Sequence, residues 1–284
     1  MILSRNLIPV LLHGLLALLF LPLSGAAMDA PQNMDQSVNW RIEEVSRFHA
    51  PQATQGVAVG PDHLYAIGTL SVAKYDRKSL ELQAEWSSER GGPIVHFNAG
   101  VVLGNQLVVA HSNYPEIPMT GSVEWFDTQT LQPSGTHSFG AYFGSVTWVL
   151  RHEEAWWVCF AHYGNRAAEP NRDPNWTSLV RFDDQWRRTG GWVFPQELMA
   201  HLGGQFTLSG GGFGPEGFLY VTGHDEPEMY VLRMPKQGSV LEWISTLSIP
   251  AEGQAFAWDP TESNTFFCIV RSTREIVKCR LITD

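Results

Sequence analysis

The sequence is poor in cysteine, in basic residues and, after its first 27 residues, in long apolar runs. Only Cys159, Cys268 and Cys279 occur in 284 residues, which excludes a dense disulfide framework. Nineteen Lys and Arg stand against 29 Asp and Glu, and a formal charge of −10 repels phosphate backbones, so nucleic acid is not an expected partner. The later chain has no apolar stretch of the roughly 20 residues that a membrane span requires.

Two of the cysteines lie in adjacent predicted strands. Segments 267–272 and 275–280 are apolar and separated by Thr273 and Arg274. A two-residue turn there places Cys268 directly opposite Cys279, so a disulfide between them is conceivable. Directly opposed positions often give strained bridges and buried free cysteine is common, so reduced thiols are the alternative.

Residues 1–27 have the composition of a cleaved signal peptide. Arg5 supplies a positive charge, residues 7–23 are almost wholly apolar, and small residues follow. We therefore expect a secreted or periplasmic monomer with no membrane span after cleavage; an uncleaved N-terminal anchor is the alternative. Residues 28–39 are expected to be a flexible segment, and residues 40–284 a single domain.

The remaining composition favours an all-β protein. Glycine is abundant at 26 residues, charged residues make up only 17%, and 11 Trp and 15 Phe supply bulky core material. The stretch 211–224 is predicted to form an apolar strand, a Gly-Pro turn and a second apolar strand. The stretch 56–69 repeats this pattern, which indicates a repeat architecture.

Five such units follow one another. The predicted strands are 56–60, 63–69, 71–77 and 81–87; 97–103, 106–112, 121–127 and 135–140; 145–151, 155–162, 177–183 and 188–194; 207–213, 217–223, 228–234 and 239–248; and 253–258, 265–271 and 275–282. Four antiparallel strands repeated every 40–65 residues or so are typical of β-propeller blades. The last unit lacks a strand, and the isolated segment 40–48 can supply it.

The predicted fold is therefore a five-bladed β-propeller of four-stranded antiparallel blades, with the last blade closed by the N-terminal strand. A sixth blade hidden in the long third unit is the alternative. Residues 196–202 are predicted to form a short helix instead of further strands.

Some motifs resemble known propeller families. Tyr220-Val221-Thr222-Gly223 in its hairpin is similar to YVTN-type repeats, and the blades resemble those of the gluconolactonase and senescence-marker-protein group. Thr54-Gln55-Gly56-Val57, followed by Leu64-Tyr65 and Tyr75-Asp76, resembles the opening blade of plant-type glutaminyl cyclotransferases, which implies five blades. The acidic active-site segment of that family has no counterpart here, so the resemblance implies no activity.

The loops predict which face of the propeller is functional. We name the strands of a blade a to d from the centre outward. The a–b turns are short, whereas b–c connections include the long segments 113–121 and 164–176, and one d–a crossover carries the predicted helix. Long loops on a rigid scaffold usually carry binding, so the face with the b–c and d–a connections is the predicted mouth.

Histidines recur where the b strands reach this mouth. Equivalent positions in the five units are Thr69, His111, His162, His224 and Arg271. Because neutral imidazole is a favoured ligand of divalent metals, His111, His162 and His224 are predicted ligands of a cation such as zinc, manganese or calcium, or of ligand oxygens. Matching residues at strand ends can instead simply satisfy backbone groups.

The remaining candidates complete a hypothetical site. His96 is a candidate catalytic proton carrier or fourth metal ligand, Asp225 a candidate base, and Arg271 a partner for an anionic group. Further ligand-binding candidates are His201, Gln55 and Gln254.

Two functions follow from these residues. The first is a propeller that binds a small polar ligand, with or without a hydrolase, lyase or cyclase activity. The alternative is a non-catalytic platform for protein interaction, because propellers host both.

Overall fold

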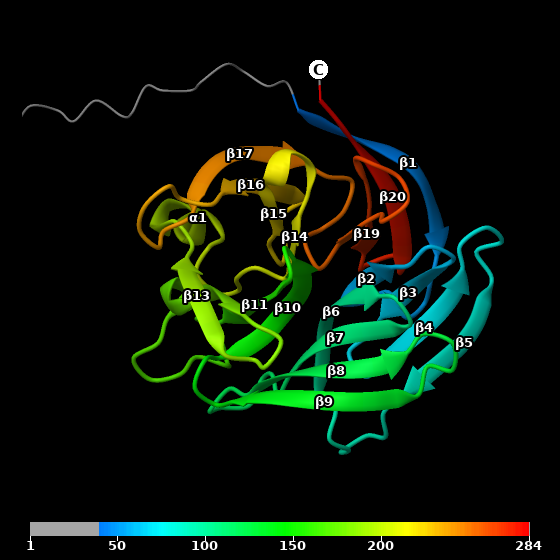
Figure 1. Ribbon diagram of the computed structural model, residues 1–284, viewed down its shortest axis with the longest axis horizontal. Coiled ribbons are helices and arrows are strands. Elements are labelled where there is room, and N and C mark those ends of the chain that lie inside the picture. Colours follow the sequence, from blue (N-terminus) through cyan, green and yellow to red (C-terminus); the bar gives the residue numbers. More distant parts are fainter. Residues whose placement is uncertain (1–39, 284) are drawn as a thin grey trace, which may run out of the picture. The chain divides into compact units, whose positions relative to one another are not determined.

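The computed structural model describes residues 40–283, and these form five four-stranded antiparallel sheets. The sheets are arranged as blades around a centre, with β2, β6, β10 and β14 inside and β5, β9, β13 and β17 at the rim (Figure 1). The prediction of a five-bladed propeller is confirmed. The predicted signal peptide and the segment 28–39 lie outside the described residues.

The strand bounds follow the predicted ones closely in most blades. Blade 1 contains β2 (Gly56–Val59), β3 (His63–Ile67), β4 (Ser71–Asp76) and β5 (Leu82–Ser87). Blade 2 contains β6 (His96–Leu103), β7 (Gln106–Ser112), β8 (Gly121–Asp127) and β9 (Pro133–Gly140). Blade 3 contains β10 (Ser145–His152), β11 (Ala155–Ala161), β12 (Ser178–Phe182) and β13 (Arg188–Val193).

The last two blades follow the same order. Blade 4 contains β14 (Gly210–Phe213), β15 (Leu219–Thr222), β16 (Glu228–Arg233) and β17 (Glu242–Ser248). Blade 5 contains β18 (Ala257–Trp258), β19 (Thr265–Val270), β20 (Glu275–Ile282) and β1 (Arg41–His49). In the described part of the chain, three short helices interrupt the strands: η1 (Pro174–Trp176), α1 (Gln196–His201) and η2 (Pro215–Gly217). None of the helices among residues 40–283 has the length and apolar character to cross a membrane.

The N-terminal strand closes the ring. β1 pairs antiparallel with β20 from Arg41–Ile282 to His49–Glu275, interrupted by one irregularity between Glu44 and Ser46. Arg47 fixes this seam, since its guanidinium contacts Glu44 on its own strand and Glu275 on β20. The two ends of the propeller are therefore joined within one sheet, and the inner strands of blade 5 have no open outer edge.

Blade 5 also corrects the predicted cysteine register. Its β19–β20 connection has four residues, 271–274, so Cys268 lies opposite Val277 and Cys279 lies opposite Phe266. The two thiols are diagonal neighbours with sulfur atoms 3.8 Å apart, and Cys159, Cys268 and Cys279 are all free and buried. The longer turn moves the register by two residues, which keeps both side chains on one face of the sheet.

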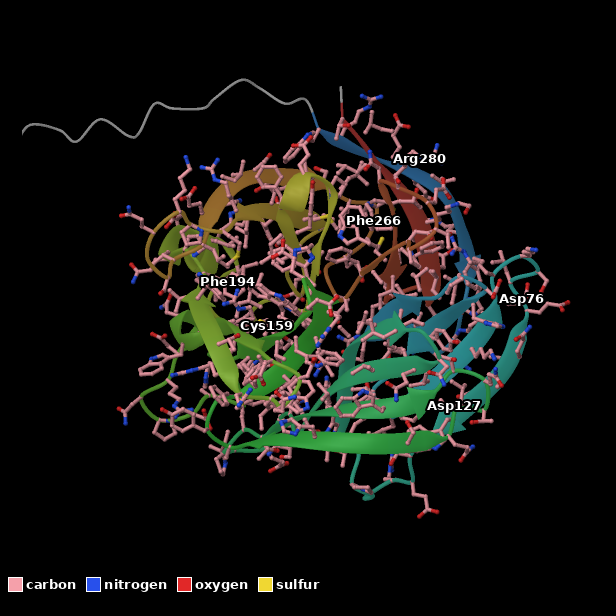
Figure 2. The ribbon with its side chains drawn as sticks, in the orientation of Figure 1. Asp76, Asp127, Cys159, Phe194, Phe266 and Arg280 are labelled. Atoms are coloured by element: carbon pink, nitrogen blue, oxygen red, sulfur yellow. The ribbon has the colours of Figure 1, made fainter. Side chains whose placement is uncertain are left out.

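An aspartate at the end of the c strand closes the c–d turn in three blades. The carboxylate of Asp76 accepts hydrogen bonds from the backbone N–H groups of Lys78 and Ser79. Asp127 and Asp183 make corresponding contacts in blades 2 and 3, and Figure 2 shows Asp76 and Asp127 on their neighbouring blades. These bonds lower the pKa of each carboxyl, which suits a turn-forming role.

Glycine allows the inner strands to approach one another. A Cβ on Gly211 would lie 2.6 Å from Cε2 of Trp148, which is fully buried in the neighbouring blade. Such a contact is closer than carbon atoms tolerate, so this position requires glycine for packing.

We expect Gly211→Ala to destabilise the fold by about 1–3 kcal/mol, because the new methyl group displaces the Trp148 indole. Gly135→Ala is the matched control. Gly135 lies on the outer strand β9, and its Cβ would lie 3.8 Å from Trp125, which is an ordinary van der Waals contact. Urea unfolding followed by tryptophan fluorescence measures both. Equal stability of the two variants would contradict the packing argument.

Candidate functional site

A cavity of about 380 Å³ lies where the b–c and d–a connections of all five blades meet. It lies on the face that the loop lengths indicated, and we call it the mouth cavity. Its lining residues are Gln55, Thr69, His96, Asn98, Tyr114, Thr147, Tyr163, Arg166, Phe206, Thr207, Leu208, Ser209, His224, Gln254 and Arg271. The structure therefore brings together five of the predicted site residues: Gln55, His96, His224, Gln254 and Arg271.

Amide side chains at the starts of the inner strands are held in fixed orientations. Gln55 donates from Nε2 to Thr69 Oγ1 at 3.0 Å, and Gln254 donates to the His224 carbonyl at 3.0 Å. Asn98 donates from Nδ2 to the Val146 carbonyl at 2.8 Å. Gln254 adopts a left-handed φ of 76° while 3% exposed, a strained backbone of the kind found at ligand sites.

Two buried threonines line the cavity. Thr147 and Thr207 are 4% and 3% exposed. Within residues 40–283 the Oγ1 of Thr207 makes no hydrogen bond, whereas the Thr147 hydroxyl interacts with the Cys159 thiol. Thr147 lies at an irregularity between Val146 and Trp148 of β10, where an extra residue changes the direction of the side chains. A buried hydroxyl without a partner costs about 1–3 kcal/mol, so Thr207 favours a bound polar ligand.

Two arginines provide the charge of the cavity. Among the described residues, neither Arg166 nor Arg271 forms an ion pair, and no carboxylate lines the cavity. Arg166 lies over the ring of Tyr114, with its Cζ 5.4 Å from the ring centroid. Other arginines are paired with acids, for example Arg151 with Asp184 at 2.6 Å and Arg233 with Glu242 at 2.6 Å. The mouth cavity is thus locally cationic in an acidic protein.

His96 lies in this cationic environment as a neutral imidazole. Burial, and next the positive charge of Arg271, lower the pKa of His96 to about 4, with Arg166 adding to the effect. Its ring packs against Tyr114 at 5.2 Å in an edge-to-face arrangement. At neutral pH the ring therefore offers both a donor and an acceptor nitrogen to a ligand.

His224 is held on both sides. Its ring stacks on Phe206 with centroids 3.8 Å apart and planes at 7°. Its Nδ1 lies 2.5 Å from Oδ1 of Asp225, whose side chain is 68% exposed and outside the cavity lining. Asp225 therefore orients the imidazole and does not itself reach the cavity as a base.

His111 and His162 do not join His224 at the mouth. His111 lies in a separate cavity between blades 1 and 2, where Nε2 accepts from the Val95 N–H at 2.9 Å and Nδ1 contacts Ser122 Oγ at 2.8 Å. His162 is 2% exposed, with Nε2 3.1 Å from the Phe143 carbonyl and Nδ1 3.3 Å from Glu169.

His111 faces away from the mouth cavity because side chains alternate between the two faces of a strand. His111 lies inside the β7–β8 ladder opposite Ser122, and its side chain faces blade 1. The next residue, Ser112, faces the other way and contacts Asn98. His111 therefore differs from its counterparts because β7 continues past it. His162 lies just after β11, and its ring is directed away from the mouth by its contacts with Phe143 and Glu169.

The predicted metal site is corrected accordingly. Within residues 40–283 no group of three or more His, Cys, Asp or Glu side chains is placed to hold a metal ion. His201 is likewise outside the mouth cavity, with Nε2 2.7 Å from Oε2 of Glu228. The cavity that the structure does form is suited to oxygen-rich anions, because its donors are guanidinium, imidazole, amide and hydroxyl groups.

Sequence reasoning missed several residues of the cavity. They are Asn98, Tyr114, Thr147, Tyr163, Arg166, Phe206, Thr207 and Ser209. Tyr114 and Arg166 lie in the two long b–c loops that were expected to be functional. The length of these loops could therefore have identified both as candidate ligand-binding residues. Thr207 had no such signal, because its importance comes from burial without a hydrogen-bond partner among residues 40–283.

No protein-family model and no curated protein matches the sequence. Many chains of solved structures are similar to it, including the following two. A chain of "Crystal Structure of Mitotic Checkpoint Complex" is 10% identical, has a TM-score of 0.44 and covers 95% of this chain and 100% of its own length. "Crystal structure of RRP9 WD40 repeats" is 10% identical with a TM-score of 0.48, covering 80% of this chain and 79% of that one. The arrangement of its own five sheets identifies this chain as a β-propeller.

Proposed function

We propose that this protein is exported and binds a small anionic ligand in the mouth cavity. The observation that carries the proposal is the pair Arg166 and Arg271, which line a cavity without carboxylates and have no ion-pair partner among residues 40–283. A guanidinium group binds carboxylate or phosphate through two parallel hydrogen bonds. The cavity volume of about 380 Å³ suits a ligand of metabolite size.

The other groups of the cavity supply polar contacts and an apolar wall. The Thr207 hydroxyl, which has no hydrogen-bond partner among residues 40–283, can bond to a ligand oxygen. Tyr114, Tyr163 and Phe206 form aromatic surface beside them. The ligand is therefore a compact anion with further oxygen atoms and an apolar portion.

A catalytic version of this function uses the two histidines. His224, oriented by Asp225, and the neutral His96 both line the cavity, so one can accept a proton while the other donates one. The protein-interaction alternative draws on the long b–c loops, where Ile117 and Trp176 are 49% and 58% exposed.

We expect Arg271→Met and Arg166→Met each to weaken binding of succinate about 10-fold or more, because each removes a charge-assisted hydrogen bond worth about 1.5–3 kcal/mol. Arg188→Met is the matched control, since Arg188 is exposed and outside the cavity. Calorimetry at constant ionic strength measures the affinity, with neutral succinamide as the uncharged analogue. Equal binding by all three variants, or no binding of succinate and sulfate, would reject the anion site.

Binding of sulfate is expected to strengthen as the pH falls from about 8 to about 5, where sulfate keeps its double charge. The pKa of His96 is about 4 without a ligand, and a nearby anion raises it, so binding takes up a proton. His96→Gln should flatten this pH dependence while leaving binding at pH 8 nearly unchanged. An unaltered slope in His96→Gln would show that another group takes up the proton.

Export has its own test. When the full-length chain is expressed with a functional secretion system, the mature protein should begin at Met28, directly after the small residues 24–27. Intact-mass measurement of the extracellular or periplasmic fraction gives the start. A full-length chain found only in the membrane fraction would favour the uncleaved anchor.

A further inference from the structure

A second cavity, of about 710 Å³, lies between blades 1 and 2 and shares no lining residue with the mouth cavity. We call it the side cavity. Its apolar walls come from Trp86, Pro93, Ile94, Phe126 and Pro133, and its acidic groups are Glu89 and Glu124. Among residues 40–283, no lysine or arginine lines it. Its charge is therefore opposite to that of the mouth cavity.

Glu124 is the polar anchor of the side cavity. Its side chain is 14% exposed, and Oε1 accepts hydrogen bonds from Ser122 Oγ at 2.6 Å and from Thr136 Oγ1 at 3.0 Å. Within the described part of the chain, the second oxygen, Oε2, has no hydrogen-bond partner, nor does Lys or Arg pair with this carboxylate. Burial raises the pKa of Glu124, which reflects the cost of an ion without a counter-charge.

The neighbouring histidine does not supply that counter-charge. Nε2 of His111 accepts from the Val95 N–H, so the ring proton lies on Nδ1 and is donated to Ser122 Oγ. Burial lowers the pKa of His111 to about 4, so the ring is neutral at physiological pH. The Ser122 hydroxyl then donates onward to Glu124.

This order of donors has a chemical consequence. Ser122, His111 and Glu124 resemble a nucleophilic triad in composition, but the imidazole donates to the hydroxyl instead of accepting its proton. Ser122 is therefore not activated for attack. The network fixes one oxygen of Glu124 and leaves the other available to a ligand.

We propose that the side cavity binds a small organic amine with an aromatic or other apolar body. The ammonium group pairs with Oε2 of Glu124, and the body packs against Trp86, Ile94 and Phe126. An amine satisfies the carboxylate that the protein leaves without a cation, and the walls favour an apolar substituent over a hydrated metal ion. The volume of about 710 Å³ accepts a two-ring molecule.

Phenethylamine is a suitable probe, with 2-phenylethanol as its neutral analogue. We expect Glu124→Gln to weaken phenethylamine binding about 10-fold or more and to leave 2-phenylethanol unchanged. Calorimetry measures affinity, and amide chemical shifts of Val95 and Ser122 locate the site. Glu154→Gln is the control for loss of one negative charge, since the Glu154 side chain is fully exposed.

A second variant keeps the test independent of any folding defect in Glu124→Gln. Ser138 is exposed and lines the side cavity, so Ser138→Trp should fill the cavity and abolish binding without disturbing the core. Arg271→Met should retain phenethylamine binding, which separates this site from the mouth cavity. Equal binding of amine and alcohol, or unchanged amine binding in Glu124→Gln and Ser138→Trp, would overturn the proposal.

Discussion

The close approach of the inner strands is the constraint on which the rest of the structure depends. A Cβ on Gly56 would lie 2.7 Å from Cβ of Ala255, and one on Gly210 would lie 2.8 Å from Cα of the same alanine. Three blades therefore meet at positions with almost no side chain. Because the sheets converge there, the polar residues directly before the small ones (Gln55, Ser209 and Gln254) are brought into one cavity.

The sequence was sufficient to predict the blades for a simple reason. Each blade repeats apolar strands separated by turn residues, and these signals are local. The completion of blade 5 by β1 could also be predicted, because the strand-like segment 40–48 had no local partner while the last unit lacked a strand. The starts of the inner strands were the least predictable, as in β14, which begins at Gly210 and not at 207.

The site was predictable only in part, and the reason is again geometric. His224 and Arg271 lie just beyond the ends of their b strands and reach the mouth cavity. His111 occupies the equivalent position by counting, but β7 continues to Ser112, so its side chain is held between blades. For His111, one further residue of strand separates a ligand-binding position from a structural one, and local sequence does not specify strand length. His162 lies just beyond β11, as Arg271 lies just beyond β19, but its ring is held by the Phe143 carbonyl and Glu169, so strand length alone does not decide its place.

Two further features could not be predicted from the sequence, for a related reason. They are the irregularity of β10 at Thr147 and the pairing register of Cys268. Both depend on how two strands pair, and pairing is set by packing between blades as much as by the turn. At Cys268, a turn of four residues and one of two residues fit the same apolar pattern. Only the contacts of the folded sheet distinguish them.

The charge distribution separates long-range from short-range effects. With a net charge of −10, the field of the protein attracts cations and repels anions at a distance. An anion that enters the mouth cavity must therefore gain its affinity from direct contacts. Arg166 and Arg271 provide them, and among residues 40–283 no carboxylate lines the cavity. At the side cavity the field and Glu124 act in the same direction. Added salt should consequently weaken the binding of an amine more than that of an anion, since screening removes an attraction in the first case and a repulsion in the second.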